Sequence, residues 1–429
     1  MSDKITYIDH SQWQREVLEA EQPVVVDFYS SECPPCEALA AKYEALAELY
    51  GDDVKFIKIF RQENRDLASS LGITGSPTVI FYRRGDRVGD RLTGGIKRAA
   101  VEDNLVKLIA PERAQAIQTR KQRTVTDCDV LILGGGPAGL TAGIYTAQAK
   151  LHTVLVDRGL AGGNVALTHT VSNYPGFIEP QPGYLLAHNM SEQARHAGVE
   201  MRQAVDITRV DLARREVEID GLETIRGRTV VVATGSSPRP LGLPGELEFR
   251  GRGISYCATC DAKYYEGKHV VVIGGGNSAL EEAQLIAKFA SRITLVHQFA
   301  EFQANRQAQE AVRQNPKFEF LMEHEPRAFL QKGDTVGEVE VEDLKTHQRR
   351  VLACDGVFIF AGMQPNLEPL AEQLTLDDWG YVRVDSDMHT NLPGVFAAGD
   401  VRATRYRQMT TAVADGTVAA MALSRELGA

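Results

Sequence analysis

Features that would direct the chain to a membrane, to nucleic acid or to an oxidising compartment are missing from the sequence. The first residues, MSDKITYIDHSQW, contain no apolar run of the signal-peptide type, and no later segment has the length of a membrane span. The formal net charge is −10, and no basic stripe offsets it, which argues against nucleic-acid binding. We therefore expect a cytoplasmic protein with no membrane association and no nucleic-acid partner.

Cysteine is also scarce, with six residues in 429. Four of them form two C-x-x-C pairs, Cys33–Cys36 and Cys257–Cys260. Without a secretion signal, such pairs more often exchange electrons or bind metal than staple a fold. A shared four-thiolate zinc site is the weaker interpretation, because more than 200 residues separate the pairs, and we predict no metal. Cys128 and Cys354 stand alone among strand-like residues and are expected to be small buried hydrophobes.

The length of the chain predicts more than one domain. A chain of 429 residues exceeds what one hydrophobic core usually organises. The composition, 43% hydrophobic and 24% charged, is typical of a soluble protein. Local patterns divide the chain into a first unit over residues 1–110, a polar and charge-rich linker over 111–126, and a larger remainder.

The first unit begins with a buried strand that leads into the first cysteine pair. Val24–Tyr29 is an apolar run interrupted by one carboxylate. The helix predicted after Cys33-Pro-Pro-Cys36 carries apolar residues on one face and stops at Gly51. Cys33 therefore lies at a helix N-terminus, where unpaired N–H groups and the dipole stabilise a thiolate. This makes Cys33 the attacking sulfur and Cys36 the resolving one.

The rest of this unit continues an alternation of strands and helices. The pattern predicts a strand over 54–60, a helix over 64–71 and a β-hairpin around 84–86. Pro77 enters the strand before the hairpin, which predicts a cis peptide bond beside the thiols.

Taken together, these features resemble thioredoxin over roughly the whole unit. The matching features are Asp27 at the strand end, the cysteine pair at a helix start, Pro77 and Gly94. The resemblance implies that buried Asp27 relays a proton for Cys36, with Lys58 as a possible neighbour. Thioredoxins usually carry Trp-Cys-Gly-Pro-Cys, whereas Glu32 replaces the tryptophan and Pro34 the glycine here. Partner choice should differ, because the aromatic side chain beside the thiol is missing.

The remainder of the chain contains an internal repeat. Residues 129–157 and 269–297 align without a gap at an offset of 140 residues. Each copy reads as strand, glycine turn, helix and strand, which is a dinucleotide-binding βαβ unit. The turn residues are Gly134, Gly136 and Gly139 in the first copy and Gly274, Gly276 and Ala279 in the second. Two copies in the right context are strong evidence, whereas a single glycine motif is weak.

The two copies end differently. Asp157 closes the first and is placed to bind a ribose hydroxyl, whereas His297 closes the second and cannot accept hydrogen bonds in the same way.

Two dinucleotide motifs with a C-x-x-C pair indicate a flavin disulfide reductase. From Asp127 onward, the order of elements resembles bacterial thioredoxin reductase of the low-molecular-weight type. Cys257-Ala-Thr-Cys260-Asp261 precedes the second glycine motif, as in that family. The further matching segments are Ala233-Thr234-Gly235, Gly362 with Pro365-Asn366, Val395 to Asp400, and Arg407-Gln408-Met409.

The resemblance implies an α/β fold in which a thioredoxin-like domain precedes two Rossmann-like domains of the thioredoxin reductase type. The FAD-binding domain would comprise residues 127–242 and 365–429, and the NAD(P)-binding domain, with the cysteine pair, residues 243–364. We expect a homodimer.

Site residues follow from the same resemblance. Asp261 would be the acid that protonates the leaving thiolate or dithiol. The residues implied for FAD are Gly134, Gly136, Pro137, Ala138, Gly139, Asp157, Asn164, Asn173, Thr234, Gly235, Gly399, Asp400, Arg407, Gln408 and Met409. Those implied for the nicotinamide nucleotide are Gly274, Gly276, Asn277, Ser278, Ala279 and His297.

The electron donor is the least determined part. In this family the strand after the second glycine motif usually continues His-Arg-Arg-x-x-x-Arg, and the arginines bind the 2′-phosphate of NADPH. Here the segment is His297-Gln-Phe-Ala-Glu-Phe-Gln303, so all three arginine positions are lost. We therefore rank NADH above NADPH, because the glycine turn is intact and NADH-using alkyl-hydroperoxide-reductase flavoproteins also lack the arginines. Reduced ferredoxin, or a reversed flow that oxidises a dithiol with oxygen, remain alternatives.

These observations predict a flavin-dependent disulfide oxidoreductase. Electrons would pass from NADH through FAD and Cys257/Cys260 to Cys33/Cys36, and then to a protein disulfide or a peroxiredoxin-type partner. A domain rotation is expected, with hinges near residues 240–244 and 362–366. The alternatives are a dithiol oxidase, a ferredoxin-linked thioredoxin reductase, and a non-enzymatic redox sensor or chaperone.

Overall fold

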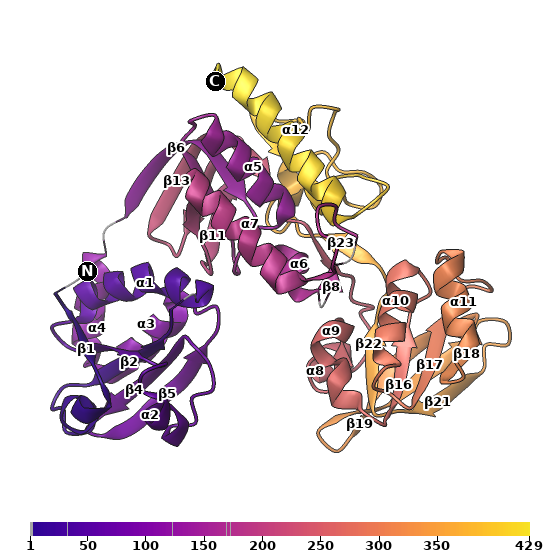
Figure 1. The fold of residues 1–429 in the computed structure, drawn as a ribbon, viewed down its shortest axis with the longest axis horizontal. Coiled ribbons are helices and arrows are strands. Elements are labelled where there is room, and N and C mark those ends of the chain that lie inside the picture. The colour runs from indigo at the N-terminus through magenta and orange to yellow at the C-terminus, as the bar shows by residue number, and fades with distance from the viewer. Residues whose placement is uncertain (1–2, 32, 122, 169, 172) are drawn as a thin grey trace. The chain divides into compact units, whose positions relative to one another are not determined.

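The computed structural model describes residues 3–31, 33–121, 123–168, 170–171 and 173–429, without the side chains of Thr170 and Cys260. Its contacts define two compact units (Figure 1). The first comprises Met1–Val165, Leu185–Gly235 and Leu367–Ala429, and the second comprises Ala166–Tyr184 and Ser236–Asn366. Among the described residues, we find no helix with both the length and the apolar character needed to cross a bilayer.

The N-terminal part of the first unit is a five-stranded sheet with helices on both faces. The strand order is β1-β3-β2-β4-β5, and central β2 pairs parallel with β3 and antiparallel with β4. The strands are β1 Ile5–Ile8, β2 Val24–Tyr29, β3 Lys55–Phe60, β4 Thr78–Arg83 and β5 Asp86–Thr93. The helices are α1 Pro34–Tyr50, α2 Arg65–Ser70, α3 Arg98–Leu108 and α4 Pro111–Arg120.

Alternation along β2 explains why both faces of this sheet are covered. Val25 packs into the core formed with α1 and α3, whereas Val24 and Val26 pack into the opposite core with Trp13 and α2. Successive side chains of a strand point to opposite faces, so a run of three valines supplies both cores.

The predicted elements of this part are confirmed, including the strand Val24–Tyr29, the helix that ends at Tyr50 and the hairpin between β4 and β5. Helix α4 lies inside the range predicted as the linker. Its Ile117 is buried in the core that also contains residues of α1 and α3.

The first copy of the repeat forms the central strands of a seven-stranded sheet. The order is β10-β7-β6-β13-β12-β11, and β24 also pairs with β13. Strands β10, β7, β6, β13 and β24 are parallel, and β12 and β11 add an antiparallel extension. The strands are β6 Thr124–Leu133, β7 Thr153–Val156, β10 Glu200–Arg202, β11 Ile207–Asp211, β12 Glu216–Ile219, β13 Glu223–Val232 and β24 Val395–Ala397. The helices of this part of the chain are α5 Pro137–Gln148, α6 Gly163–Leu167, α7 Gly183–Ala197 and α12 Met409–Leu427.

The second copy forms a parallel five-stranded sheet with the order β15-β22-β16-β17-β18. Its strands are β15 Ile254–Ser255, β16 His269–Ile273, β17 Arg292–His297, β18 Phe318–Met322 and β22 Gly356–Ile359. Strands β19 His324–Lys332, β20 Thr335–Asp343 and β21 Arg349–Ala353 form an antiparallel sheet. The helices are α8 Glu246–Phe249, α9 Ala258–Asp261, α10 Asn277–Ile286 and α11 Arg306–Gln314.

Two short ribbons complete the strands. Strand β14 Ser236–Pro238 pairs antiparallel with β23 Met363–Pro365, and β8 Thr170–Val171 pairs with β9 Gln181–Pro182. The β6-α5-β7 and β16-α10-β17 segments are equivalent βαβ units, so the repeat and the α/β fold class are confirmed.

Helix α12 packs very closely on α5 at one glycine. A Cβ added to Gly416 would lie 2.2 Å from the carbonyl oxygen of Ala138. That atom belongs to the backbone of the glycine-rich turn's helix, so it cannot move aside as a flexible side chain could. Gly416 therefore sets the distance between the two helices.

We predict that Gly416→Ala destabilises this part of the fold by about 1–3 kcal/mol, since the added methyl group forces the helices apart. Denaturant unfolding of the variant measures the loss. Gly143→Ala, on α5, is the matched control, because its Cβ would meet the Val199 side chain at 3.1 Å and not the backbone. Equal stabilities for the Gly416→Ala variant and the unmodified protein would contradict the prediction.

Candidate redox and dinucleotide sites

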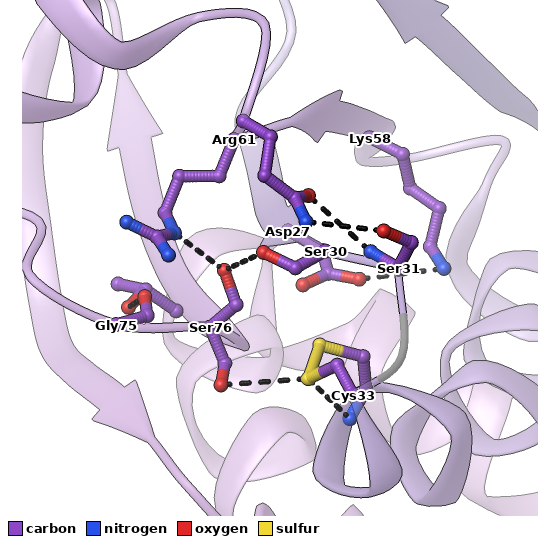
Figure 2. Close-up of a disulfide and its surroundings, with 11 residues drawn as sticks. Asp27, Ser30, Ser31, Cys33, Lys58, Arg61, Gly75 and Ser76 are labelled. Carbon is purple, nitrogen blue, oxygen red and sulfur yellow. Dashed lines mark hydrogen bonds and ion pairs between the residues drawn. A yellow bond between two sulfur atoms is a disulfide. The ribbon is translucent and has the colours of Figure 1, made fainter.

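The first cysteine pair is a disulfide at the start of α1 (Figure 2). Cys33 is the N-cap residue, and its sulfur accepts a hydrogen bond from Cys36 N at 3.3 Å. The predicted position of Cys33 at a helix N-terminus is therefore correct, and this is where a helix dipole stabilises a thiolate.

The loop that contains Pro77 lies against this disulfide. The Ser76–Pro77 peptide bond is cis, as predicted, and Cys33 Sγ lies 3.6 Å from Ser76 O. The Ser76 hydroxyl is held from two sides, because Arg61 Nε and Ser30 Oγ both donate to it at 2.8 Å. Arg61 and Ser30, which the sequence patterns did not identify as site residues, therefore hold this loop in place.

Asp27 is fully buried beneath the same region, with an exposed fraction of 0%. Its nearest cation is Lys58 Nζ, 3.4 Å from the carboxylate (Figure 2). Burial raises the pKa of Asp27 to about 6, and the lysine opposes that rise. A carboxyl group with this pKa can carry a proton near neutral pH.

The first glycine turn has the geometry of a dinucleotide cradle. Gly134 has φ +108°, and a Cβ there would lie 2.3 Å from Ala233 O, so the turn abuts the segment that continues into Thr234. A Cβ on Gly139 would lie 1.9 Å from Gly134 O. By contrast, a Cβ on Gly136 would meet nothing within 4 Å, so the N-terminus of α5 is open to a ligand there.

Asp157 orders this turn from the end of β7. Its carboxylate accepts hydrogen bonds from Gly135 N and Gly159 N, both at 2.6 Å. Burial raises the pKa of Asp157, and the two N–H donors oppose the rise.

The C-terminal segment is locked beside the same turn. Gly399 N donates to buried Asp415, and Arg402 forms a bidentate ion pair with that carboxylate at 2.6 and 2.7 Å. A Cβ on Gly399 would lie 2.9 Å from Ala138 Cβ. This arrangement brings Gly399 against the start of α5, where Pro137 is the first helical residue.

Arg407 carries an unusual contact before α12. Its guanidinium group lies 3.7 Å from the centre of the Tyr381 ring, and Nε is buried without a hydrogen-bond partner among the described residues. A buried donor without a hydrogen-bond partner fits a polar ligand such as FAD. Gln408 is the N-cap of α12 and Met409 its first residue.

The remaining residues predicted for FAD are distributed over both units. Asn164 and Gly235 belong to the first unit and Asn173 to the second, while Asp400 lies in a 3-10 turn after β24. The residues that the structure shows in direct proximity are therefore the turn, Asp157, the Ala233–Thr234 segment and Gly399.

The second glycine turn repeats the first. Gly274 has φ +134°, and a Cβ there would lie 2.3 Å from Phe360 O, whereas Gly276 is open. Ala279 is fully buried behind the turn. Asn277 Oδ1 accepts from Asn305 N and Nδ2 at 2.7 and 3.0 Å, and Asn277 and Ser278 form the exposed first turn of α10.

His297 is buried at the end of β17. Its ring packs on Gly275, lies 5.4 and 5.7 Å from the rings of Phe299 and Phe302, and has Nε2 3.2 Å from Glu301 O. Burial lowers the pKa of His297, so the ring is neutral at neutral pH. It supplies no positive charge for a phosphate group.

The second cysteine pair begins at helix α9. Cys257 precedes this helix and is disulfide-bonded, and Asp261 is its last residue. The side chain of Cys260 lies outside the described residues. Cys257 N donates to Ser255 Oγ at 3.1 Å, and that hydroxyl donates to Cys257 O at 3.2 Å.

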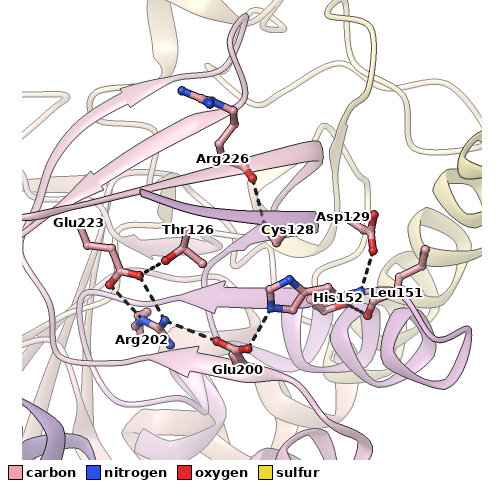
Figure 3. A network of polar contacts seen from close by, with 10 residues as sticks. Thr126, Cys128, Asp129, Leu151, His152, Glu200, Arg202, Glu223 and Arg226 are labelled. Carbon is pink, nitrogen blue, oxygen red and sulfur yellow. Dashed lines mark hydrogen bonds and ion pairs between the residues drawn. The ribbon is translucent and has the colours of Figure 1, made fainter. Parts of the chain in front are cut away.

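The two lone cysteines are free and buried, as predicted. Burial raises the pKa of Cys128 and of Cys354 to about 12, so neither is a reactive thiol. A pocket of about 380 Å³ lies beside Cys128, but charged groups that line it already have partners: Arg228 pairs with Asp129, and His152 contacts Glu200 (Figure 3). It lies toward the amino ends of the parallel strands, and ligands bind at the carboxyl ends.

Sequence patterns missed several residues that shape these sites. Ser76 and Arg61 beside the first disulfide, Ser255 beside Cys257, and the Arg402–Asp415 pair carry no motif of their own. The only available signal was their proximity in sequence to predicted site residues.

Comparison with known proteins identifies the families that the two parts of the chain match. The family model for pyridine nucleotide-disulphide oxidoreductases matches residues 128–416, and the thioredoxin model matches residues 4–107. Over 302 residues, the chain is 41% identical to thioredoxin reductase of Peptoclostridium acidaminophilum. The aligned residues make up 68% of this chain and 94% of that relative. It is 38% identical over 295 residues to that of Bacillus subtilis, which covers 69% and 93%. The crystal structure of Lactococcus lactis thioredoxin reductase matches with TM-score 0.65 and 34% identity, over 70% of this chain and 98% of the other.

We predict that Asp27→Asn stabilises the thioredoxin-like part at pH 8 and that the gain shrinks as the pH falls from 6 to 4. The folded-state pKa, about 6, lies above the unfolded value, so the folded form binds the proton more tightly and loses stability as the pH rises. The size of the shift corresponds to at most about 3 kcal/mol. Hydrogen exchange of the β2 and β3 amides at several pH values measures it.

The matched control is Asp66→Asn, because Asp66 is exposed on α2. A pH-independent difference between Asp27→Asn and the unmodified protein would refute the assignment of the titration to Asp27.

Proposed function

Because the chain belongs to the pyridine nucleotide-disulphide oxidoreductases, and within them to the thioredoxin reductases, we propose that it is a reductase with its own thioredoxin. Electrons pass from NADH through FAD and Cys257/Cys260 to Cys33/Cys36, and then to a protein disulfide. One observation carries this proposal. A single chain contains both the Cys33–Cys36 disulfide, with the buried carboxylate of Asp27 near it, and a region that matches the pyridine nucleotide-disulphide oxidoreductases.

FAD, when bound, supplies a two-electron carrier between the nicotinamide and the disulfide. The open N-terminus of α5 at Gly136 would receive its pyrophosphate, and Asp157 fixes the turn that does so. Arg407, with its buried unpartnered Nε, would be positioned against it by the Tyr381 ring.

The transfer between the two cysteine pairs is an exchange that balances without a further reactant. A thiolate of the reduced Cys257/Cys260 pair attacks the Cys33–Cys36 disulfide and forms a mixed disulfide. The second thiol of the same pair then displaces the bound sulfur and restores the Cys257–Cys260 disulfide. Two thiols and one disulfide are present before and after, so only protons need to move.

Asp27 is suited to move one of those protons. It is buried below the Cys33–Cys36 helix, and its pKa of about 6 lies close to the working pH. Protonated Asp27 would give its proton to the departing Cys36 thiolate, and the carboxylate would take it back when Cys36 next resolves a mixed disulfide. Asp261, the last residue of α9, would serve the other pair.

The surroundings of His297 favour NADH as the donor over NADPH. The positions where the family carries arginines hold Gln298, Phe299 and Gln303, and the His297 ring is neutral. A 2′-phosphate would therefore find no cation among these groups, whereas the intact turn at Gly274 and Gly276 still accepts a pyrophosphate.

The family also suggests how the domains move, how the protein assembles and which acceptor it reduces. The two crossover segments pair in the β14–β23 ribbon, which would let adjacent residues absorb the backbone changes of a domain rotation. We propose that the protein works as a cytoplasmic homodimer and that a peroxiredoxin-type protein is one acceptor.

We predict that NADH bleaches the flavin of the purified protein in an anaerobic titration and that NADPH does so far less efficiently. In the Phe299→Arg, Gln303→Arg double variant, kcat/KM for NADPH should rise about 10- to 100-fold, because charge-assisted hydrogen bonds to a phosphate are restored. The Phe299→Leu, Gln303→Ala variant is the matched control and should leave NADPH use low. Bleaching by a dithiol or by reduced ferredoxin, but not by NADH, would replace the donor assignment.

We predict that Cys33→Ser lowers the reduction of an added protein disulfide by about 100-fold or more, because the attacking sulfur is lost. Reduction of the small disulfide 5,5′-dithiobis(2-nitrobenzoate) by the Cys257/Cys260 pair should persist, which controls for damage to the reductase. Full activity of Cys33→Ser on the protein disulfide would remove the thioredoxin-like domain from the pathway.

A further inference from the structure

Tyr256, the residue directly before Cys257, is tied to a buried carboxylate. Its hydroxyl group donates a hydrogen bond to Glu246 Oε1, ten residues earlier in the chain. Glu246 is the first residue of α8 and is 1% exposed. The Arg250 guanidinium group also lies 5.3 Å from the centre of the Tyr256 ring. All of these residues belong to the second compact unit, so the contacts are internal to it.

The Glu246 carboxylate accepts three backbone hydrogen bonds as well. Leu241 N lies 2.9 Å from Oε1, and Gly242 N and Leu243 N lie 2.6 and 3.2 Å from Oε2. Burial alone would raise the pKa of Glu246, but the Tyr256 hydroxyl and the three N–H donors lower it below its usual value. The group is therefore a carboxylate at neutral pH, and a charged acceptor strengthens each of these hydrogen bonds.

The chain on either side of this carboxylate is anchored to β19. Pro244 O accepts a hydrogen bond from Phe329 N at 2.9 Å. Gly245 has φ +83°, and a Cβ there would lie 2.3 Å from Phe329 O. Glu246 thus presents its carboxylate from a position that the packing of the second unit fixes.

The stretch that leads into the second cysteine pair is held step by step. Strand β15 attaches Ile254 and Ser255 to β22. The buried Ser255 hydroxyl then accepts from Cys257 N at 3.1 Å and donates to Cys257 O at 3.2 Å. Beyond the end of the strand, the bond from Tyr256 to Glu246 attaches the residue next to Cys257 to the anchored segment.

We infer that Glu246 and Tyr256 are positioning residues for the Cys257/Cys260 pair, because they fix the backbone beside Cys257 relative to the second unit. This rests on the proposed role of Cys257/Cys260 as the redox pair. The same carboxylate holds residues 241–243, so the cysteine pair moves together with this segment in the proposed domain rotation. Accurate placement matters, since a misplacement of about 1 Å can slow a reaction about 100-fold.

The step that this positioning serves is the exchange of electrons between the cysteine pair and the flavin. In the direction from dithiol to flavin, the two thiols lose two electrons and two protons and form the S–S bond. Both electrons and both protons pass to oxidised FAD. The Tyr256 hydroxyl is not consumed, so its loss should change the rate of the exchange and not its equilibrium.

The test compares the FAD-loaded full-length protein with its Tyr256→Phe and Tyr264→Phe variants. Phenylalanine keeps the ring and removes the hydroxyl group. Tyr264 is the matched control, because it is 63% exposed in the turn that follows α9. Bleaching of the flavin by saturating dithiothreitol is followed anaerobically by stopped flow, which requires no nicotinamide nucleotide. Hydrogen exchange of the peptide 255–261 and the dithiol–disulfide equilibrium in dithiothreitol redox buffers are measured on the same proteins.

We expect the flavin of Tyr256→Phe to bleach about 10-fold more slowly and the peptide 255–261 to exchange faster. The redox equilibrium should stay unchanged, and Tyr264→Phe should match the unmodified protein in all three measurements.

A second variant tests the other end of the contact. Glu246→Gln should speed hydrogen exchange of the Leu241–Leu243 amides, because glutamine offers one acceptor oxygen in place of two. Tyr256→Phe should preserve the exchange of these amides. Glu248→Gln, at an exposed position of the same helix, is the control.

The outcomes separate this inference from the function on which it rests. If dithiothreitol fails to bleach the flavin of the unmodified protein, or bleaches that of Cys257→Ser equally fast, the proposed redox pair is wrong. If bleaching depends on Cys257 and Tyr256→Phe matches the unmodified protein in bleaching rate and hydrogen exchange, the positioning role is overturned. A slower variant whose redox equilibrium shifts to the same extent would also overturn it, because the hydroxyl group would then act on the potential of the pair.

Discussion

Both dinucleotide domains depend on one close approach, that of the first glycine of each turn to the end of a neighbouring segment. A Cβ on Gly134 would lie 2.3 Å from Ala233 O, and a Cβ on Gly274 would lie 2.3 Å from Phe360 O. Any side chain at either position would push the turn off the sheet and move the helix behind it. Because the free N–H groups of that helix are where a pyrophosphate would bind, the packing of the sheet and the proposed binding of the cofactor depend on the same constraint.

The C-terminal segment, which is distant in sequence, also packs closely against the helix of the first glycine turn. Gly399 and Gly416, from the C-terminal segment, both approach Ala138 at distances that exclude larger residues. Asp415 secures this return through Gly399 N and the bidentate Arg402. The domain that contains the first glycine turn is therefore completed by a chain segment that follows the whole second copy of the repeat, and the two pieces share their hydrophobic cores.

Local patterns predicted those parts of the fold that local sequence determines. Strand Val24–Tyr29, helix α1, the cis bond before Pro77 and both glycine turns follow from apolar periodicity, capping and φ requirements. What could not be predicted are contacts that join segments with no motif. The burial of Ile117 in the thioredoxin-like core and the stacking of Arg407 on Tyr381 are of this kind. Such contacts depend on where the fold places residues that belong to no motif, so they cannot be predicted from composition or from the spacing of motifs.

Two carboxyl groups show how the chain assigns different roles to one chemistry. Burial raises the pKa of Asp157 and of Asp27, but the groups that oppose the rise differ. Asp157 accepts two backbone hydrogen bonds and orders a turn, whereas Asp27 faces one lysine at 3.4 Å. Asp157 is therefore an anchor, because both hydrogen bonds hold the glycine turn. Asp27 lies near the Cys33–Cys36 disulfide, where a carboxyl group with a raised pKa can supply a proton at the moment a thiolate departs. The cost of burying Asp27 is thus incurred where proton movement is needed.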